Sequence, residues 1–205
     1  MISEKFQKLV KLFSQFPTVG QRTATRFVYY ILKLDNNEVE ELINEILELR
    51  KNIRQCPLCF NLFETRDEND KICPICSDRK RDKSLICLVE KETDLLAIEA
   101  IKKYNGLYLV LGGTVGKLDD KKDRETIEKR VQVLVERIQK GEIKEVILAF
   151  NQTLQGKKTA DFVKKLLKDT NVKISQLGRG LPTGGELEYA DEETLLAALE
   201  SRKTL

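Results

Sequence analysis

Two short cysteine motifs, Cys56-Pro-Leu-Cys59 and Cys73-Pro-Ile-Cys76, separate a helical first part of the sequence from a second part in which strand and helix patterns alternate. Two residues between the thiols of each motif let one tight turn present both sulfur atoms to a tetrahedral ion, and the prolines stiffen these turns. Four thiolates fill the coordination sphere, so we expect one structural Zn²⁺ with no open position for catalysis. Two disulfides or a redox pair are the alternative, which a reducing compartment disfavours.

The composition is that of a globular protein. A chain of 205 residues, of which 41% are hydrophobic, can fill one domain and one or two small modules. No apolar run approaches the roughly 20 residues that cross a bilayer, and the first residues lack the apolar stretch of a secretory signal, so a cytoplasmic protein with no membrane partner is expected. The sequence contains no histidine, which excludes catalytic triads that depend on imidazole. Any catalysis would depend on carboxylates or a metal.

The first 33 residues are basic, with six Lys or Arg side chains against one acid, although the whole chain has a net charge of only +3. Ser3 can cap a first helix that ends before Pro17, and a second helix begins after Gly20. Gly20 would permit close approach of the backbone to a phosphate, and Arg22 and Arg26 would add positive charge beside the free N–H groups of the second helix. These features predict a helix-hairpin-helix DNA-binding motif. A helical corner with a solvated basic face is the alternative.

A third helix is expected over residues 37–53, and strands and helices alternate beyond the cysteines. The strands, which are continuous apolar runs, are expected at 85–89, 107–111, 146–150 and 172–177. Helices are expected at 92–104, 125–140 and 157–168. This alternation predicts an α/β domain with a mostly parallel sheet and helices on both faces. Cys87 lies within the first strand and is expected to be a small buried hydrophobic side chain.

Ligands of such folds bind at the carboxyl ends of the strands, where Glu90 follows the first strand and Asn151 to Gly156 follow the third. Glu90 followed by Asp94 resembles the first motif of the Toprim domain, which is found in topoisomerases, bacterial primases and certain nucleases. In its catalytic members this glutamate acts with an Asp-x-Asp motif after a later strand, and the carboxylates hold Mg²⁺. Asn151 and Thr153 stand in the place of the two aspartates, so the resemblance implies a site without catalysis. Without the resemblance, Glu90 reads as a solvated charge at a strand end.

The resemblance extends over nearly the whole chain. The motifs are the hairpin 16–22, the four cysteines, Val89-Glu90, Asn151-Gln152-Thr153 with Gly156, and the run Arg-Gly-Leu-Pro-Thr-Gly-Gly-Glu-Leu-Glu-Tyr at 179–189. Their order resembles that of the RecR family of bacterial recombination mediators. The resemblance implies a non-enzymatic clamp that binds single-stranded and duplex DNA and forms a ring-like homotetramer. With RecO, and often RecF, such a protein helps to load RecA at gapped DNA.

Four segments are expected. They are a helical helix-hairpin-helix domain at 1–54, a zinc finger at 55–79, a Toprim-like domain at 80–175 and a C-terminal oligomerisation segment at 176–205. The last contains a glycine-rich crossing and a final helix at 192–202, which could pack on a neighbouring subunit. By the same resemblance, a surface that meets RecO is expected at Glu90, Asn151, Thr153 and Gln155.

Three features depart from the family pattern. Family members usually carry proline at the position of Gln152, glutamate at the position of Gln155, and a glycine- and proline-rich loop where this chain has 116–122. The first two alter the surface expected to meet partners, so they bear on partner affinity and leave the fold unaffected.

Three other functions were compared with this reading. A phosphate loop starting at Gly112 is one residue short, and Leu118 replaces its magnesium-binding hydroxyl, so no ATPase is expected. A magnesium-dependent Toprim nuclease is the main alternative, and the neutral side chains of Asn151 and Thr153 argue against it. An RNA-binding zinc-ribbon protein is a third possibility, which a strong preference for structured RNA would favour.

Overall fold

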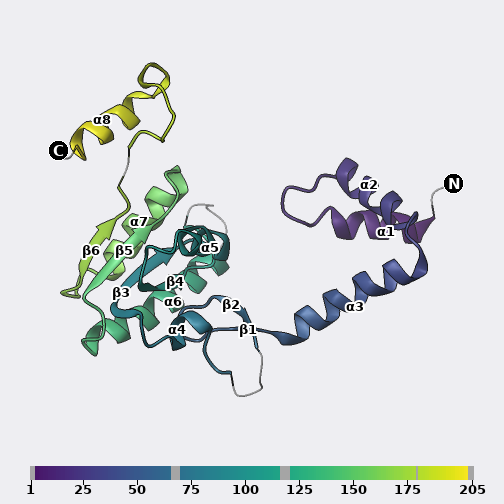
Figure 1. Cartoon of the computed structure of the whole chain (residues 1–205), viewed down its shortest axis with the longest axis horizontal. Helices are drawn as coiled ribbons and strands as arrows, with labels where there is room; N and C mark the ends of the chain where they lie inside the picture. The colour runs from purple at the N-terminus through teal and green to yellow at the C-terminus, as the bar shows by residue number, and fades with distance from the viewer. Residues whose placement is uncertain (1–2, 66–69, 116–120, 179, 203–205) are drawn as a thin grey trace. The chain divides into compact units, whose positions relative to one another are not determined.

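The computed structural model describes residues 3–65, 70–115, 121–178 and 180–202. These residues form two compact units, which divide in the sequence between Ile53 and Arg54. The first unit is helical and the second is α/β (Figure 1). Most of the unusual loop at 116–122 and the Arg179 of the C-terminal motif lie outside the described residues. No helix within the described ranges is long and apolar enough to cross a membrane.

The first unit contains α1 (Glu4–Phe13), α2 (Gln21–Ile31) and α3 (Asn36–Asn52). Ser3 caps α1 as expected, because its side chain accepts a hydrogen bond from the Phe6 N–H. A capping box of Asp35 and Glu38 starts α3. The helices α1 and α2 pack around a small core, which consists of Val10, Ala24 and Val28 with partly buried apolar side chains around them. None of the residues of α3 is buried.

The second unit is organised around a four-stranded parallel sheet with the order β4-β3-β5-β6. The strands are β3 (Asp82–Val89), β4 (Gly106–Val110), β5 (Glu145–Ala149) and β6 (Lys173–Gln176). The helices between them are α5 (Glu92–Ala100), α6 (Lys121–Gln139) and α7 (Leu154–Leu166). The predicted α/β fold with a parallel sheet is therefore confirmed. The helix α5 ends at Ala100 and not at residue 104 as expected, because Lys102 takes a positive φ of 55° just after it.

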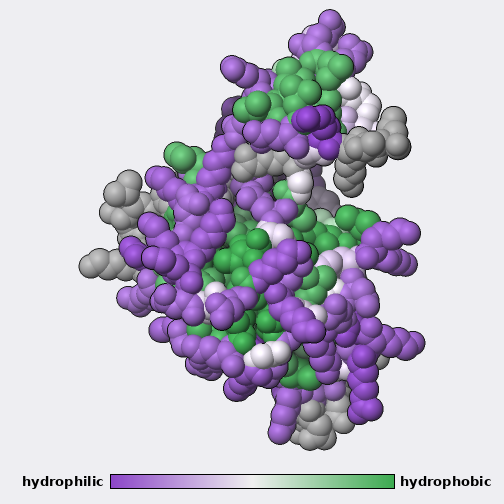
Figure 2. All heavy atoms as spheres, turned by 90° about the vertical axis from the view of Figure 1, so that its left-hand side faces the viewer, coloured by the Kyte–Doolittle hydropathy of each residue, from purple (hydrophilic) through white to green (hydrophobic). Residues whose placement is uncertain are grey.

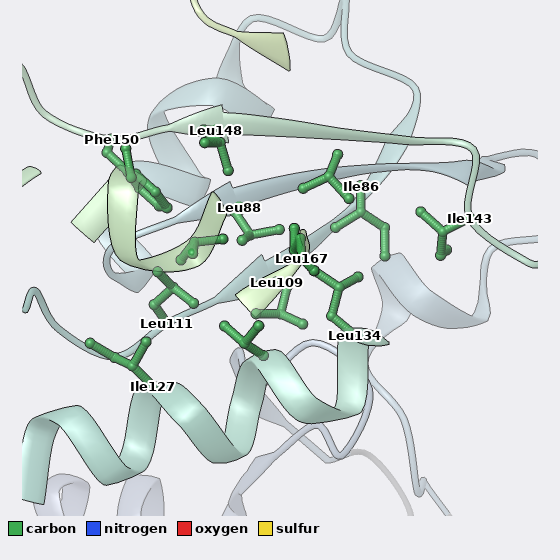
Figure 3. Packing of buried hydrophobic residues seen from close by; sticks show 14 of the residues in the cluster. Ile86, Leu88, Leu109, Leu111, Ile127, Leu134, Ile143, Leu148, Phe150 and Leu167 are labelled. Atoms are coloured by element: carbon green, nitrogen blue, oxygen red, sulfur yellow. The ribbon is translucent and has the colours of Figure 1, made fainter. Parts of the chain in front are cut away.

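Both faces of this sheet are covered. On one face, side chains of β3, β4 and β5 point toward α6 and α7, and Figure 3 shows Leu88, Leu109 and Leu148 of the sheet with Ile127 and Leu134 of α6. On the opposite face Leu95 of α5 packs with Cys87, Val89, Tyr108 and Val110. Cys87 is buried as expected. The alternation of side chains along each strand thus supplies two cores, the larger of which faces α6 and α7.

The cysteine-containing segment belongs to the second unit. It consists of a two-stranded sheet, β1 (Ile53–Gln55) with β2 (Leu62–Glu64), and a short helix, α4 (Pro74–Ser77). The carbonyl oxygen of Cys59 accepts a hydrogen bond of 2.8 Å from the Val110 N–H of β4. The guanidinium of Arg130 lies 5.0 Å above the Phe60 ring and donates to the Val110 carbonyl at 2.9 Å. We call each Cys-Pro-x-Cys turn a knuckle, and the knuckle at 56–59 is therefore held to the end of β4.

The C-terminal segment follows β6 and contains a single 3₁₀ turn, η1 (Leu187–Tyr189), and α8 (Glu192–Glu200). Neither element has a buried residue. Lys157 of α7 forms an ion pair with Glu193 of α8. Apolar side chains gather at the surface of this segment, at the top of Figure 2. The large exposed ones are Leu181, Leu187, Tyr189, Leu196 and Leu199.

Candidate functional site

The four predicted metal ligands lie together. The sulfur atoms of Cys56, Cys59, Cys73 and Cys76 all lie within 4.8 Å of one another, and all four residues are buried. All five cysteines of the chain are free thiols in this structure, as a metal site requires. Tetrahedral bonds of about 2.3 Å place sulfur atoms roughly 3.8 Å apart, and the Cys59 and Cys73 sulfurs are 3.5 Å apart. The chain thus contains a four-cysteine cluster whose sulfur atoms are close enough together to hold one metal ion.

The thiols of this cluster are coupled through hydrogen bonds. The bond with Cys59 holds the pKa of the Cys56 thiol far below its usual range, and the same bond raises the pKa of Cys59. The pKa of the Cys73 thiol is lowered as well, so the arrangement favours thiolates at Cys56 and Cys73. Thiolates are the form that binds metals, so the cluster is already arranged to exchange its protons for a cation.

The predicted DNA-binding residues lie on the exposed side of α2. Gly20 is the N-cap of this helix, and its backbone carbonyl accepts from the Ala24 N–H. The first turn has neither an acidic residue nor a side-chain cap, so its N–H groups can receive an anion. Arg22 and Arg26 are both exposed and, four residues apart, share one face. A methyl group at Gly20 would meet no atom within 4 Å, so the turn itself does not require glycine.

The residues at the carboxyl ends of the strands are arranged in two layers. Glu90 is only 7% exposed, whereas Asn151, Thr153 and Gln155 are exposed. The Glu90 carboxylate accepts one hydrogen bond of 2.9 Å from the Asn151 backbone N–H and another of 2.7 Å from the Asn151 side-chain amide. Asp94 accepts from the Lys91 N–H at the start of α5. Glu90 therefore lies beneath the expected partner surface.

The start of α7 is fixed by side-chain and backbone contacts. Thr153 caps this helix by accepting from the Gly156 N–H at 3.1 Å. A Cβ at Gly156 would lie 2.0 Å from the Asn151 carbonyl oxygen and 3.0 Å from Glu90 Oε1, so only glycine fits there. Thr159 is fully buried, and its hydroxyl donates to the Gln155 carbonyl and accepts from the Val115 N–H. The segment at 151–156 is therefore a rigid elbow.

The sequence reasoning missed two residues here. Leu154, the first residue of α7, is 65% exposed between polar neighbours. A large apolar side chain at the first helical position of an otherwise polar run is a signal that could have identified it. Arg130, which joins the knuckle to β4, lies within a charged helix and carries no such signal.

The donors around Glu90 do not form a cation site. In the parts of the chain that the structure describes, Glu90 belongs to no group of three or more potential metal ligands. Its two hydrogen bonds come from an amide and a backbone N–H, which are donors and cannot bind a cation. This arrangement differs from the clustered carboxylates that two-metal phosphoryl transfer requires.

Together these features define an α/β protein of the Toprim type, with an N-terminal helical hairpin and a four-cysteine metal-binding cluster. The sequence matches the Toprim domain family over residues 84–178, the RecR helix-hairpin-helix family over 6–49 and the RecR C-terminal family over 180–203. The chain belongs to the RecR family. It is 39% identical over 199 residues to the Recombination protein RecR of Clostridium perfringens, covering 97% of this chain and 96% of that protein. It is 38% identical over the same length to the protein of that name from Bifidobacterium adolescentis, with the same coverage.

Proposed function

We propose that this protein is a non-enzymatic DNA-binding clamp and partner scaffold in recombinational DNA repair, which helps RecO, often with RecF, to load RecA at gapped DNA. The observation that carries the proposal is the Glu90 carboxylate, whose two hydrogen bonds both come from Asn151. A nuclease of the Toprim type needs carboxylates at this edge to hold its cations. The names of the relatives support a role in recombination.

DNA binding is assigned to the first turn of α2. Its uncapped N–H groups, together with Arg22 and Arg26 on the same exposed face, form a contact for phosphate groups. Phosphate contacts of this kind carry no sequence information. The protein would therefore bind both single-stranded and duplex DNA with little sequence preference.

The metal of the four-cysteine cluster is proposed to be one Zn²⁺. Four thiolates in a tetrahedron are the preferred ligands of structural zinc. When bound, the ion supplies folding free energy and leaves no position for a water molecule. Its role would be to hold the segment that connects the two units to the edge of the sheet.

Self-association is proposed from the apolar surface that each unit leaves exposed. In α3 the exposed apolar side chains are Leu42, Ile43, Ile46, Leu47 and Leu49. In the C-terminal segment they include Leu196 and Leu199 of α8. With exposed apolar surface in both units, each chain can contact two neighbours, and closed rings arise from such contacts. The proposed assembly is a ring-like homotetramer.

The partner surface is proposed at Asn151, Thr153 and Gln155, with Leu154 exposed between them. An exposed apolar side chain with polar groups around it matches the apolar centre and polar rim of a protein interface. The notable substitutions of this chain, Gln152 and Gln155, fall on the same surface. RecO is the proposed occupant, and Glu90 would contribute from below.

Incubation with DNA separates the scaffold from the nuclease. The purified protein should leave supercoiled and gapped DNA intact in Mg²⁺ and in Mn²⁺, while mass measurement with and without DNA should give a closed oligomer. Nicking that copurifies with the protein and disappears in Glu90→Ala would contradict the scaffold and establish the nuclease. Tighter binding to structured RNA than to DNA would favour the RNA-binding alternative.

A further inference from the structure

Asn151 donates two hydrogen bonds to the buried carboxylate of Glu90. A buried charge is costly unless its oxygens are hydrogen-bonded or paired with a cation. In Glu90 each oxygen accepts from Asn151, one from the backbone and one from the side chain. Hydrogen bonds to a charged acceptor are about twice as strong as those between neutral groups. Glu90, which follows β3, is thus hydrogen-bonded twice to Asn151, which follows β5.

The same carboxylate also lies against the start of α7. Glu90 Oε1 is 3.0 Å from the place that a Cβ of Gly156, the third residue of the helix, would occupy. The amino end of a helix favours negative charge. The carboxylate therefore connects three parts of the fold, namely the end of β3, the loop after β5 and the first turn of α7.

We propose that Glu90 is a positioning residue, which holds the 151–155 elbow in its docking conformation without touching the partner. This inference rests on the proposed function of that surface. Its two hydrogen bonds fix the elbow in the way that a divalent cation would fix it between two carboxylates. Asn151 donates to both carboxylate oxygens of Glu90, so the docking conformation requires no cation.

Substitutions at Glu90 and at Asn151 should have different effects if this is correct. Glu90→Gln keeps the shape but removes the charge, and its NH₂ group faces the Asn151 NH₂ group unless that amide turns round, so the charge-assisted bonds are weakened. Asn151→Asp places two carboxylates where the present atoms are 2.7 Å apart, and their repulsion would be relieved by a divalent cation. The variant would therefore acquire a dependence on Mg²⁺ that the natural chain lacks.

The test is hydrogen exchange, measured by NMR at the Asn151 amide of the full chain. Loss of a hydrogen bond to a charged group, worth about 1.5–3 kcal/mol, corresponds to exchange roughly 10-fold to 100-fold faster in Glu90→Gln and Glu90→Ala. In Asn151→Asp, 5 mM or so of Mg²⁺ should slow exchange across 152–156 and raise the melting temperature, with no effect on the natural chain. Unchanged exchange in both Glu90 variants, or no response of Asn151→Asp to Mg²⁺, would overturn the proposal.

A control separates this inference from the proposed function. Gln155→Ala changes the exposed surface without touching the Glu90 carboxylate, so exchange at Asn151 should stay as in the natural chain. Binding to purified RecO is measured in parallel. If Gln155→Ala and Leu154→Ala leave RecO binding intact while exchange responds to Glu90, the partner surface is wrong and the positioning role stands. Metal content and far-UV circular dichroism confirm that each variant is folded.

Discussion

The two units of this protein differ in how completely they bury their apolar side chains. The α/β unit closes a core between its sheet and α6 and α7, with a second one under α5. The helical unit buries little beyond Val10, Ala24 and Val28, and α3 buries nothing. Burial of apolar surface is the main favourable contribution to folding. The α/β unit can therefore be stable by itself, whereas the helical unit needs a covering surface from elsewhere.

Metal removal should have the largest effect, and it should act on the α/β unit. Cys59→Ser or Cys76→Ser should lose the metal, because each knuckle supplies two of the four ligands, and structural zinc contributes roughly 10 kcal/mol. Elemental analysis and thermal unfolding measure the loss. The helical content of the first unit should persist.

Cys87 provides the control for that prediction. Burial raises the pKa of its thiol to about 12, so it stays protonated at pH 8 and should not react with iodoacetamide in the presence of a chelator, whereas the four ligands should. Its folded pKa lies above the unfolded value of about 8.5, so its contribution to stability is present below pH 8.5 and falls as the pH rises toward 12. If Cys87→Ser bound less metal than the natural chain, the assignment of the four ligands would be contradicted.

A pair of leucine substitutions compares the units directly. Leu109→Ala, in the core of the α/β unit, should lower the free energy of unfolding by about 2–5 kcal/mol at any protein concentration. Leu47→Ala, on α3, removes an exposed side chain and should matter only where the chains are assembled, so its effect should grow with protein concentration. Urea unfolding at several concentrations distinguishes them. Equal effects on a monomer would show that α3 is covered within its own chain.

The smallest expected effect concerns DNA. Replacing Arg22 and Arg26 with glutamine should weaken binding to single-stranded and duplex DNA alike, and should reduce the salt dependence by about one unit of slope for each contact. The matched control replaces Lys102 and Lys103, which are exposed cations of the α/β unit, and should change the slope little. Fluorescence anisotropy over a range of salt concentrations measures both. The same slope in the two double variants would place DNA binding outside α2.

Much of the fold followed from local patterns. The apolar runs and their helical connections predicted the parallel sheet, because each strand buried on both faces needs continuous hydrophobicity. The two knuckles predicted the cluster of thiols, because ligand spacing depends on neighbouring residues. Helix ends were less predictable, as at Lys102, since a positive φ in a non-glycine residue leaves no trace in the sequence.

The sequence predicted which residues lie at the strand-end site, but it did not predict how deeply each of them is buried. The sequence places Glu90 and Asn151 at the same edge of the sheet, but it does not tell which of the two side chains is buried. That depends on long-range packing of α7 against the edge, which only Gly156 hinted at. The contact of Arg130 with Phe60 was not predictable either, because it joins residues 70 positions apart through the folded sheet.

The bond between Cys59 and Val110 has a consequence for the solubility of the protein. β4 lies at the edge of its sheet, and all five of its residues are buried. An apolar edge strand with free backbone groups is a template on which other chains can add strands. The metal knuckle occupies one of those groups and shields the strand, so it acts as a guard against intermolecular β-sheet growth. A chain stripped of its metal should therefore be lost to aggregates before its core has unfolded.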